Sequence, residues 1–193
     1  YSLSKVGLKI SLVERNPFFN EKKYTDKRTT AISEGTKNFF ESTGLWGELK
    51  AYCQPINKIK VIDRKLSNQL EFDNNRRKSN LGYIIKNNSL LNTVYSKIKN
   101  YKNIKIFNDF EVFDFQNEND QIITYSDKIK ISSDLNIAAD GKKSFVRNYF
   151  KTPVYSKSYK KSALVVTFTH TKSHNDTAFE IFYKNGPLAI LPM

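Results

Sequence analysis

The chain has 193 residues, 39% of them hydrophobic, which is enough for one large domain or two small ones with a buried core. A formal net charge of +13 would suit nucleic acid or an anionic membrane, yet only six of the 32 basic residues are Arg, the better residue for specific phosphate recognition. The many aromatic residues follow core spacing rather than neighbouring Arg, so we expect no nucleic-acid partner.

The lone Cys53 excludes a disulfide framework and favours a reducing compartment. No apolar run approaches the roughly 20 residues of a membrane helix, and no secretory signal is visible. We therefore expect a cytoplasmic protein. Because the chain starts at Tyr1 and stops without a terminal helix or tail, we also expect it to be a fragment of a longer protein.

The first predicted elements are a helix end over residues 1–6, a left-handed Gly7 and a buried strand over residues 8–13. Residues 31–52 have apolar side chains at helical spacing and predict a helix, interrupted at Gly44 and Gly47. Residues 56–72 alternate as an antiparallel ribbon does, and residues 82–85 are extended. A helix over residues 89–99 would have Ser89 as its cap.

The second half of the chain is dominated by predicted strands. Residues 104–131 predict three strands, followed by a strand over residues 135–139 and a short helix from Ser144. Three more strands are expected over residues 164–169, 179–183 and 188–191. Because helix-rich and ribbon-like segments alternate twice, we expect two domains threaded through each other.

The most informative motif is the Asp-Gly pair at Asp140 and Gly141, with Ser144 and Arg147 following at fixed spacing. A strand that ends in an acidic turn and leads to a helix N-terminus is typical of dinucleotide binding. Asp140 could accept hydrogen bonds from ligand hydroxyls, and Gly141 permits close backbone approach. The alternative is an ordinary strand, turn and helix with an ion pair.

Glu14 ends the first strand, where an acidic residue of a dinucleotide fold accepts hydrogen bonds from the adenosine ribose. On its own, a Glu at a strand end is more often a surface residue. The two carboxylates support each other only if the strand before Asp140 lies in a parallel sheet with the strand of Glu14. We therefore predict parallel pairing of residues 8–13 and 135–139.

Two further segments are weaker candidates. Arg28 could place a guanidinium against a pyrophosphate or a flavin edge, or simply lie near a helix cap. Lys86 and Asn87 follow an apolar strand and precede a helix, which has an ordinary structural explanation.

Histidines at positions 170 and 174 stand four residues apart, but in a strand that spacing spans about 13 Å, too far for one ion. We expect no metal site.

Several segments together resemble the flavin-dependent monooxygenases that hydroxylate aromatic rings, and the ubiquinone-biosynthesis hydroxylases most of all. They are residues 7–14, residues 26–33 followed by Leu45 and Trp46, residues 81–87, residues 136–147 and residues 186–192. The resemblance covers nearly the whole chain.

The resemblance implies an α/β (α+β overall) fold in which a Rossmann-type FAD-binding domain with a parallel sheet is interleaved with a mainly antiparallel substrate domain. Residues 1–55 and 83–150 would form the first domain, and residues 56–82 and 151–193 the second. It implies FAD as cofactor, NAD(P)H as transient reductant, O2 as co-substrate and an aromatic, prenylated substrate.

By motif position, the resemblance assigns FAD binding to residues in both halves of the chain: Glu14 at the adenosine ribose, Arg28, Lys86 and Asn87 along the FAD, and Asp140, Gly141 and Arg147 at FAD and the nicotinamide cofactor. Lys86 departs from the family pattern, where Glu or Gln is expected. No catalytic residue can be named. The family's glycine motif and its Gly-Asp motif are absent from these residues, so we expect the chain alone to bind FAD weakly or not at all and to be inactive.

Two alternatives remain at this point. One is another FAD- or NAD-linked oxidoreductase of the superfamily, such as a prenyl reductase, and the other is a basic nucleic-acid-binding protein without enzymatic activity. A prenylated substrate would also fit an enzyme that docks its Lys-rich face on anionic lipid, peripheral to the inner membrane.

Overall fold

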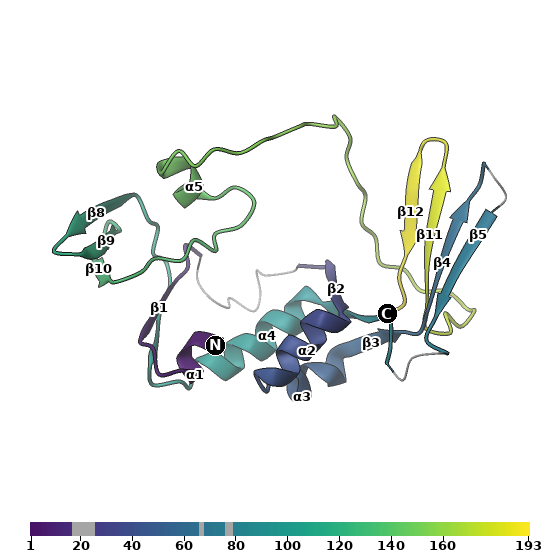
Figure 1. Cartoon of the computed structure of the whole chain (residues 1–193), viewed down its shortest axis with the longest axis horizontal. Coiled ribbons are helices and arrows are strands. Elements are labelled where there is room, and N and C mark those ends of the chain that lie inside the picture. Colours follow the sequence, from purple (N-terminus) through teal and green to yellow (C-terminus); the bar gives the residue numbers. More distant parts are fainter. Residues whose placement is uncertain (17–25, 66–67, 76–78) are drawn as a thin grey trace. The chain divides into compact units, whose positions relative to one another are not determined.

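The computed structural model describes residues 1–16, 26–65, 68–75 and 79–193, and it combines helices with parallel and antiparallel sheets (Figure 1). The α/β class expected from the sequence is confirmed. Two compact units are formed, the first from Tyr1–Leu8, Asn20–Asn103 and Val166–Met193 and the second from Lys9–Phe19 and Ile104–Val165. The division into an FAD-binding domain and a substrate domain stays a prediction.

A three-stranded sheet organises the first unit. Strand β6 (Gly82–Lys86) lies between β2 (Thr29–Ser33) and β3 (Cys53–Ile56) and pairs antiparallel with both. Because side chains alternate along a strand, the adjacent residues Ile84 and Ile85 point to opposite faces, and each is almost completely buried. One strand thus anchors two hydrophobic clusters.

The larger cluster lies where helices pack beside this sheet. The helical elements of the unit are α1 (Ser2–Lys5), α2 (Glu34–Ser42), α3 (Trp46–Leu49), the 3-10 turn η1 (Lys50–Tyr52) and α4 (Asn87–Ile98). Figure 1 shows α2, α3 and α4 grouped together. The buried residues of the cluster are Ile32, Leu45, Trp46, Leu49 and Ile85.

Two helix starts differ from the sequence prediction. Residues 31–33 belong to β2, because they pair with β6, and the helix begins only at Glu34 with Ser33 as its cap. The Ser33 hydroxyl accepts a hydrogen bond from the Thr36 amide at 3.2 Å. The later helix starts at Asn87, directly after β6, so the predicted cap at Ser89 was wrong. In both places strand pairing decides where the helix begins.

A four-stranded sheet completes the first unit, with the order β12-β11-β4-β5. The predicted ribbon is confirmed as the antiparallel pair β4 (Lys58–Asp63) and β5 (Asn68–Asp73). The hairpin of β11 (Thr177–Tyr183) and β12 (Gly186–Ile190) joins it through parallel pairing of β11 with β4. The strand expected over residues 164–169 is not formed; the Leu164 side chain is 89% exposed, so burial does not hold that segment in a sheet.

The second unit contains one parallel and one antiparallel sheet. Strand β1 (Ile10–Val13) pairs in parallel with β7 (Ile104–Phe107). Strands β8 (Asp114–Glu118), β9 (Gln121–Tyr125) and β10 (Lys130–Ser133) form an antiparallel sheet, so residues 104–133 hold four strands rather than three. Helix α5 (Phe145–Tyr149) follows.

The predicted parallel pairing between residues 8–13 and 135–139 is wrong. The first strand pairs with β7, and residues 135–139 form no strand. The Asn136 side chain instead ties this segment to the antiparallel sheet, donating to the Thr124 hydroxyl at 2.8 Å and accepting from the Ser133 hydroxyl at 2.6 Å. Leu135 and Ile137 stay about two-thirds or more exposed, and a parallel strand requires cover on both faces.

Leu49 provides a test of the packing of the first unit, because its side chain is fully buried beside the single tryptophan, Trp46. Leu49→Ala should lower the free energy of unfolding by about 2–5 kcal/mol through lost burial and a residual cavity. Urea unfolding followed by Trp46 fluorescence measures the change. The control Leu70→Ala, at a side chain that is 61% exposed, should stay within about 0.5 kcal/mol. Equal losses in both variants would contradict the described core.

Candidate functional site

Glu14 lies where the parallel pair ends, in the second unit. Its amide donates to the Phe107 carbonyl at 2.9 Å, which extends the β1–β7 ladder by one step, and its carbonyl accepts from the Phe110 amide. Its carboxylate Oε1 accepts from the amide and the side chain of Asn16 at 2.9 and 3.1 Å. The strand end thus presents a fixed acidic group, as the sequence predicted, with its orientation set by Asn16.

The Asp140 turn is built around a hydrogen-bonded helix cap. Ser144 is buried, and its hydroxyl accepts from the Arg147 amide at 3.0 Å, which confirms it as the cap of α5. Hydrogen bonds from the Ser144 hydroxyl and from the Val146 amide hold the pKa of Asp140 below its usual range. Gly141 has φ +82°, a backbone conformation that favours glycine. The turn therefore presents an ionised carboxylate at neutral pH.

An aromatic cluster attaches α5 to the antiparallel sheet. The ring of Phe115 on β8 packs against Phe145, Tyr149 and Phe150 at centroid distances of 5.2–6.4 Å. The Tyr149 hydroxyl donates to the carboxylate of Asp114, and this bond lowers the pKa of Asp114 and raises that of Tyr149. Although α5 has little burial of its own, these contacts fix the helix that carries Arg147.

The Asp140 turn and α5 surround a cavity of about 340 Å³, lined by Ala138, Asp140, Gly141, Ser144, Val146, Arg147, Phe150 and Thr152. Arg147 Nη2 donates to the Lys142 carbonyl at 2.8 Å. Its Nε is buried and has no hydrogen-bond partner among the described residues. One cavity is therefore lined by an acceptor (Asp140), a buried donor without a partner among the described residues (Arg147 Nε) and the open backbone of Gly141. These groups suit a polar ligand that carries both hydroxyl and anionic groups.

The predicted residues of the first unit meet where β2 starts and β6 ends. Arg28 donates hydrogen bonds from Nε and Nη2 to the two carboxylate oxygens of Asp26, both at 2.8 Å. Asn87 donates from Nδ2 to Asp26 Oδ2 at 3.0 Å and accepts from the Thr30 hydroxyl at 2.6 Å, while its amide donates to the Arg28 carbonyl. Lys86 pairs with Thr29 across the strands. Asp26 stands two residues before Arg28, but no role was predicted for it from the sequence.

The two charged side chains of this cluster differ in their exposure to solvent. The Asp26 side chain is 10% exposed and the Arg28 side chain 69%. Hydrogen bonds from the Arg28 side chain, and next from Asn87, hold the pKa of Asp26 far below its usual range. The buried carboxylate thus fixes the orientation of an exposed guanidinium, which is a suitable arrangement for binding a phosphate or a ring edge.

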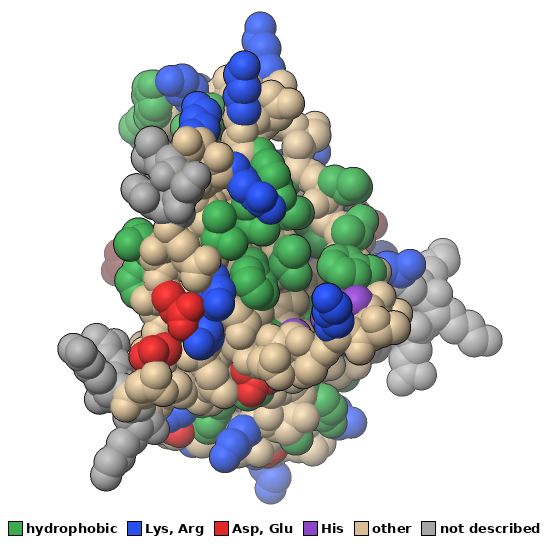
Figure 2. Space-filling view, turned by 90° about the vertical axis from the view of Figure 1, so that its right-hand side faces the viewer, with side chains coloured by type: hydrophobic (Ala, Val, Ile, Leu, Met, Phe, Trp, Pro, Cys, Tyr) green, Lys and Arg blue, Asp and Glu red, His purple; other side chains and the backbone are tan. Residues whose placement is uncertain are grey.

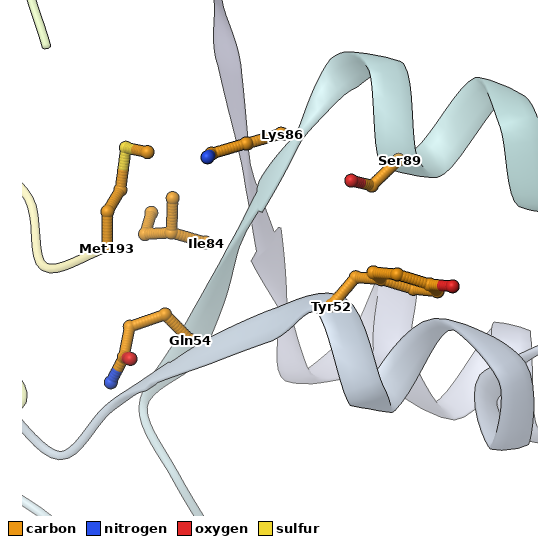
Figure 3. Close-up of a pocket in the computed structure, with 6 residues that line it drawn as sticks. All are labelled: Tyr52, Gln54, Ile84, Lys86, Ser89 and Met193. Atoms are coloured by element: carbon orange, nitrogen blue, oxygen red, sulfur yellow. The ribbon is translucent and has the colours of Figure 1, made fainter.

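A second cavity, of about 200 Å³, lies on the same sheet and is lined by Tyr52, Gln54, Ile84, Lys86, Ser89 and Met193 (Figure 3). Gln54 was not singled out from sequence; its side chain donates to Asp176 at 2.6 Å, a contact across 122 positions that no local pattern reveals. Burial raises the pKa of the neighbouring Cys53 thiol to about 11, so that residue is not a thiolate nucleophile near neutral pH.

The structure thus gathers the predicted residues into two groups. Arg28, Lys86 and Asn87 lie together in the first unit, whereas Asp140, Gly141 and Arg147 lie together in the second, which also holds Glu14. Within the described residues no group of three His, Cys, Asp or Glu side chains is arranged to hold a metal ion. The Nδ1 atom of His174 accepts a hydrogen bond from the Asp176 amide at 3.0 Å.

Comparison with known proteins identifies the family. The sequence matches the FAD binding domain family over residues 1–193. It is 28% identical to the ubiquinone biosynthesis monooxygenase COQ6 of Drosophila melanogaster, covering 96% of this chain and 41% of that protein. It is also 28% identical to the ubiquinone hydroxylase UbiL of Rhodospirillum rubrum, covering 87% of this chain and 39% of that protein.

Solved structures support the same fold. HpxO from Klebsiella pneumoniae, crystallised as a variant with FAD, superposes with a TM-score of 0.68 at 12% identity over 99% of this chain and 49% of that one. PqsL from P. aeruginosa, in complex with 2-aminobenzoylacetate, gives a TM-score of 0.67 at 17% identity over 81% and 43%. The chain belongs to the FAD binding domain family, as the resemblance implied, and spans about two-fifths of the curated relatives.

The Asp26–Arg28 pair predicts a specific acid sensitivity. Because the folded pKa of Asp26 is depressed, its contribution to stability is complete above the unfolded pKa of about 3.9 and is lost as pH falls towards the folded pKa. Asp26→Asn should lower the thermal midpoint near pH 7, and the gap to the wild type should shrink as pH falls from 5 to 2. Thermal unfolding by circular dichroism measures it.

The control is Asp127→Asn, at an exposed position, which should follow the wild-type curve at every pH. A gap between Asp26→Asn and the wild type that stays constant down to pH 2 would contradict the assignment.

Proposed function

We propose that the protein is an FAD-dependent monooxygenase that uses NAD(P)H and O2 to hydroxylate an aromatic ring, and that the ring belongs to a ubiquinone precursor. The observation that carries the proposal is the family match over the whole chain, together with curated relatives named as ubiquinone hydroxylases. These relatives favour the proposal over a nucleic-acid-binding protein and over a different oxidoreductase of the superfamily.

The residues of the chain fit FAD on their own chemistry. In the second unit, Asp140 would accept from ligand hydroxyls, Gly141 would allow close approach, and the buried Nε of Arg147 would donate to an anionic group. Glu14, held by Asn16, would accept from the adenosine ribose. In the first unit, Arg28 and Asn87 would contact the FAD through the network that Asp26 fixes.

Bound FAD would supply the oxygen-transfer chemistry, and the protein supplies position and environment. Arg28 would hold one end of the cofactor through a guanidinium already oriented by Asp26, which reduces the ordering cost of binding. Apolar lining residues such as Ile84 and Met193 would exclude water from the aromatic substrate. No residue of the described chain is assigned as a catalytic acid or base.

The FAD proposal is tested in a protein that carries this chain together with the family's glycine motif and Gly-Asp motif, by titrating it with FAD and following flavin fluorescence. Arg28→Ala should raise the Kd about tenfold or more, since a hydrogen bond to a charged group contributes about 1.5–3 kcal/mol. Arg28→Lys keeps the positive charge but loses the paired donors of the guanidinium, so its Kd should lie between those of the wild type and Arg28→Ala. The control Arg64→Ala removes a cation from the same unit and should leave the Kd unchanged. Equal effects at both arginines would contradict the role of Arg28.

We further propose peripheral association with anionic membranes. No helix in the described part of the chain is long and apolar enough to cross a bilayer. Figure 2 shows hydrophobic side chains gathered on the face that carries β4, β5, β11 and β12, with Lys and Arg around them. Strand register places Leu70, Phe72 and Phe182 on one side of this sheet, and each is 46–61% exposed. Exposed apolar groups beside cations suit a lipid surface.

Liposome sedimentation tests this association. Vesicles containing anionic lipid should retain the protein at low salt, and retention should fall as salt rises because lysine contacts are screened. Leu70→Ser with Phe72→Ser should weaken retention, whereas Phe113→Ser, at an exposed aromatic residue of the other unit, should not. Binding that does not change with salt, or equal binding to neutral vesicles, would contradict the proposal.

A further inference from the structure

A turn before β11 connects three strands of the first unit through Asp176. The Asp176 carboxylate accepts hydrogen bonds from Gln54 Nε2 at 2.6 Å, through Oδ1, and from Asn57 Nδ2 at 3.0 Å, through Oδ2. Gln54 belongs to β3, and Asn57 lies between β3 and β4. The Asp176 carbonyl accepts from the amides of Asn57 and Lys58 at 2.9 and 3.3 Å. One residue therefore links the start of β11 to both β3 and β4.

The turn that carries Asp176 has an uncommon backbone conformation and is held by His174. Asn175 and Asp176 both have left-handed φ angles, +46° and +51°, which residues other than glycine rarely adopt. The Asp176 amide donates to Nδ1 of His174 at 3.0 Å, and the Thr177 amide donates to the His174 carbonyl at 3.0 Å. A backbone amide can only donate, so Nδ1 must offer a lone pair while Nε2 carries the ring proton. The bond to Nδ1 therefore exists only while His174 is uncharged.

Protonation of His174 changes what its Nδ1 atom can bind. A protonated Nδ1 is a donor, so it no longer accepts from the Asp176 amide. Among the described residues, Asp176 is the one acidic group within 4 Å of the ring, with Oδ1 3.6 Å from Nδ1. Lys172, two residues earlier, is exposed and offers no acceptor. Because a charged hydrogen bond forms at about 2.7–2.9 Å, the carboxylate must move towards the imidazolium, and its Oδ1 is the atom that now holds Gln54.

The other charged groups near this turn have partners of their own. On β4, the Lys58 amine pairs with Glu71 of β5 at 2.6 Å. Asp73, opposite Lys58 in the strand register, accepts a hydrogen bond from an amide of its own turn at 3.2 Å. On β3, burial raises the pKa of the Cys53 thiol to about 11, so this side chain is uncharged near neutral pH. A charged His174 is therefore left with the carboxylate of its own turn.

We propose that His174 is a pH-sensitive switch for the connection between β3 and β11. Neutral His174 holds the turn, and the Asp176 carboxylate stays on Gln54; protonated His174 binds that carboxylate and releases the Gln54 side chain. The His174 and Asp176 side chains are 33% and 34% exposed, so solvent protons reach the ring without unfolding. Because Gln54 lines the cavity of about 200 Å³ on this sheet, protonation alters one wall of the cavity. The switch operates whether or not the protein binds FAD.

The test follows the full chain by NMR from about pH 8 to about pH 5.5, a range in which an ordinary imidazole titrates and an ordinary carboxyl group does not. The signals observed are the His174 ring, the Asp176 backbone amide and the Gln54 side-chain amide. We expect all three to shift with one shared midpoint. The Asp176 amide proton should move upfield because it loses its acceptor, and the Gln54 amide protons should shift because they lose the carboxylate.

Two variants separate the steps of the switch. His174→Asn keeps a side-chain acceptor two residues before Asp176, as in an Asx turn, but cannot titrate, so both amide signals should stay at their high-pH positions. In His174→Ala the Asp176 amide should lie near its low-pH position at every pH. The Gln54 signal should keep its high-pH position there, because no imidazolium attracts the carboxylate.

The control is His170→Asn, at the other histidine of the chain, which should leave both wild-type titration curves unchanged. Gln54 signals that do not follow the His174 midpoint would overturn the proposal, and this result comes from the wild type even where a variant does not fold. Titration of either amide that persists in His174→Asn, or is lost in His170→Asn, would overturn it as well.

Discussion

The first unit depends on the central position of β6. Antiparallel bonds to β2 on one side and β3 on the other hold the strand, and its alternation sends Ile85 into the helical cluster and Ile84 into the cluster shared with Ile56 and Ala178. Because the same strand continues directly into α4, Lys86 and Asn87 are positioned by two cores at once. Packing deep in the unit therefore determines where its candidate binding groups lie.

The second unit fixes its candidate site by a different means. Helix α5 has no buried residue of its own, so packing against a large core does not hold it. The Ser144 cap and the contacts of Tyr149 with β8 take that role, and through them the Asp140 carboxylate and the Arg147 side chain face one cavity. Short-range hydrogen bonds and aromatic contacts are sufficient to shape the turn. Its helix cap could therefore be predicted from the sequence.

Local chemistry explains which predictions succeeded. The left-handed Gly7, the ribbon of β4 and β5 and the Ser144 cap each depend on neighbouring residues, and each was predicted. Failures came where distant segments decide: residues 31–33 have helical spacing but pair with β6, and residues 135–139 have the composition of a buried strand but bond to the antiparallel sheet. Gln54 was not predicted as a site residue because its orientation depends on a hydrogen bond to Asp176, which is far away in the chain.

The missing pairing beside β1 changes what supports the FAD assignment. The predicted parallel sheet linking Glu14 to Asp140 is absent, so the two carboxylates do not support each other through sheet geometry. Family membership rests on the match across all 193 residues instead.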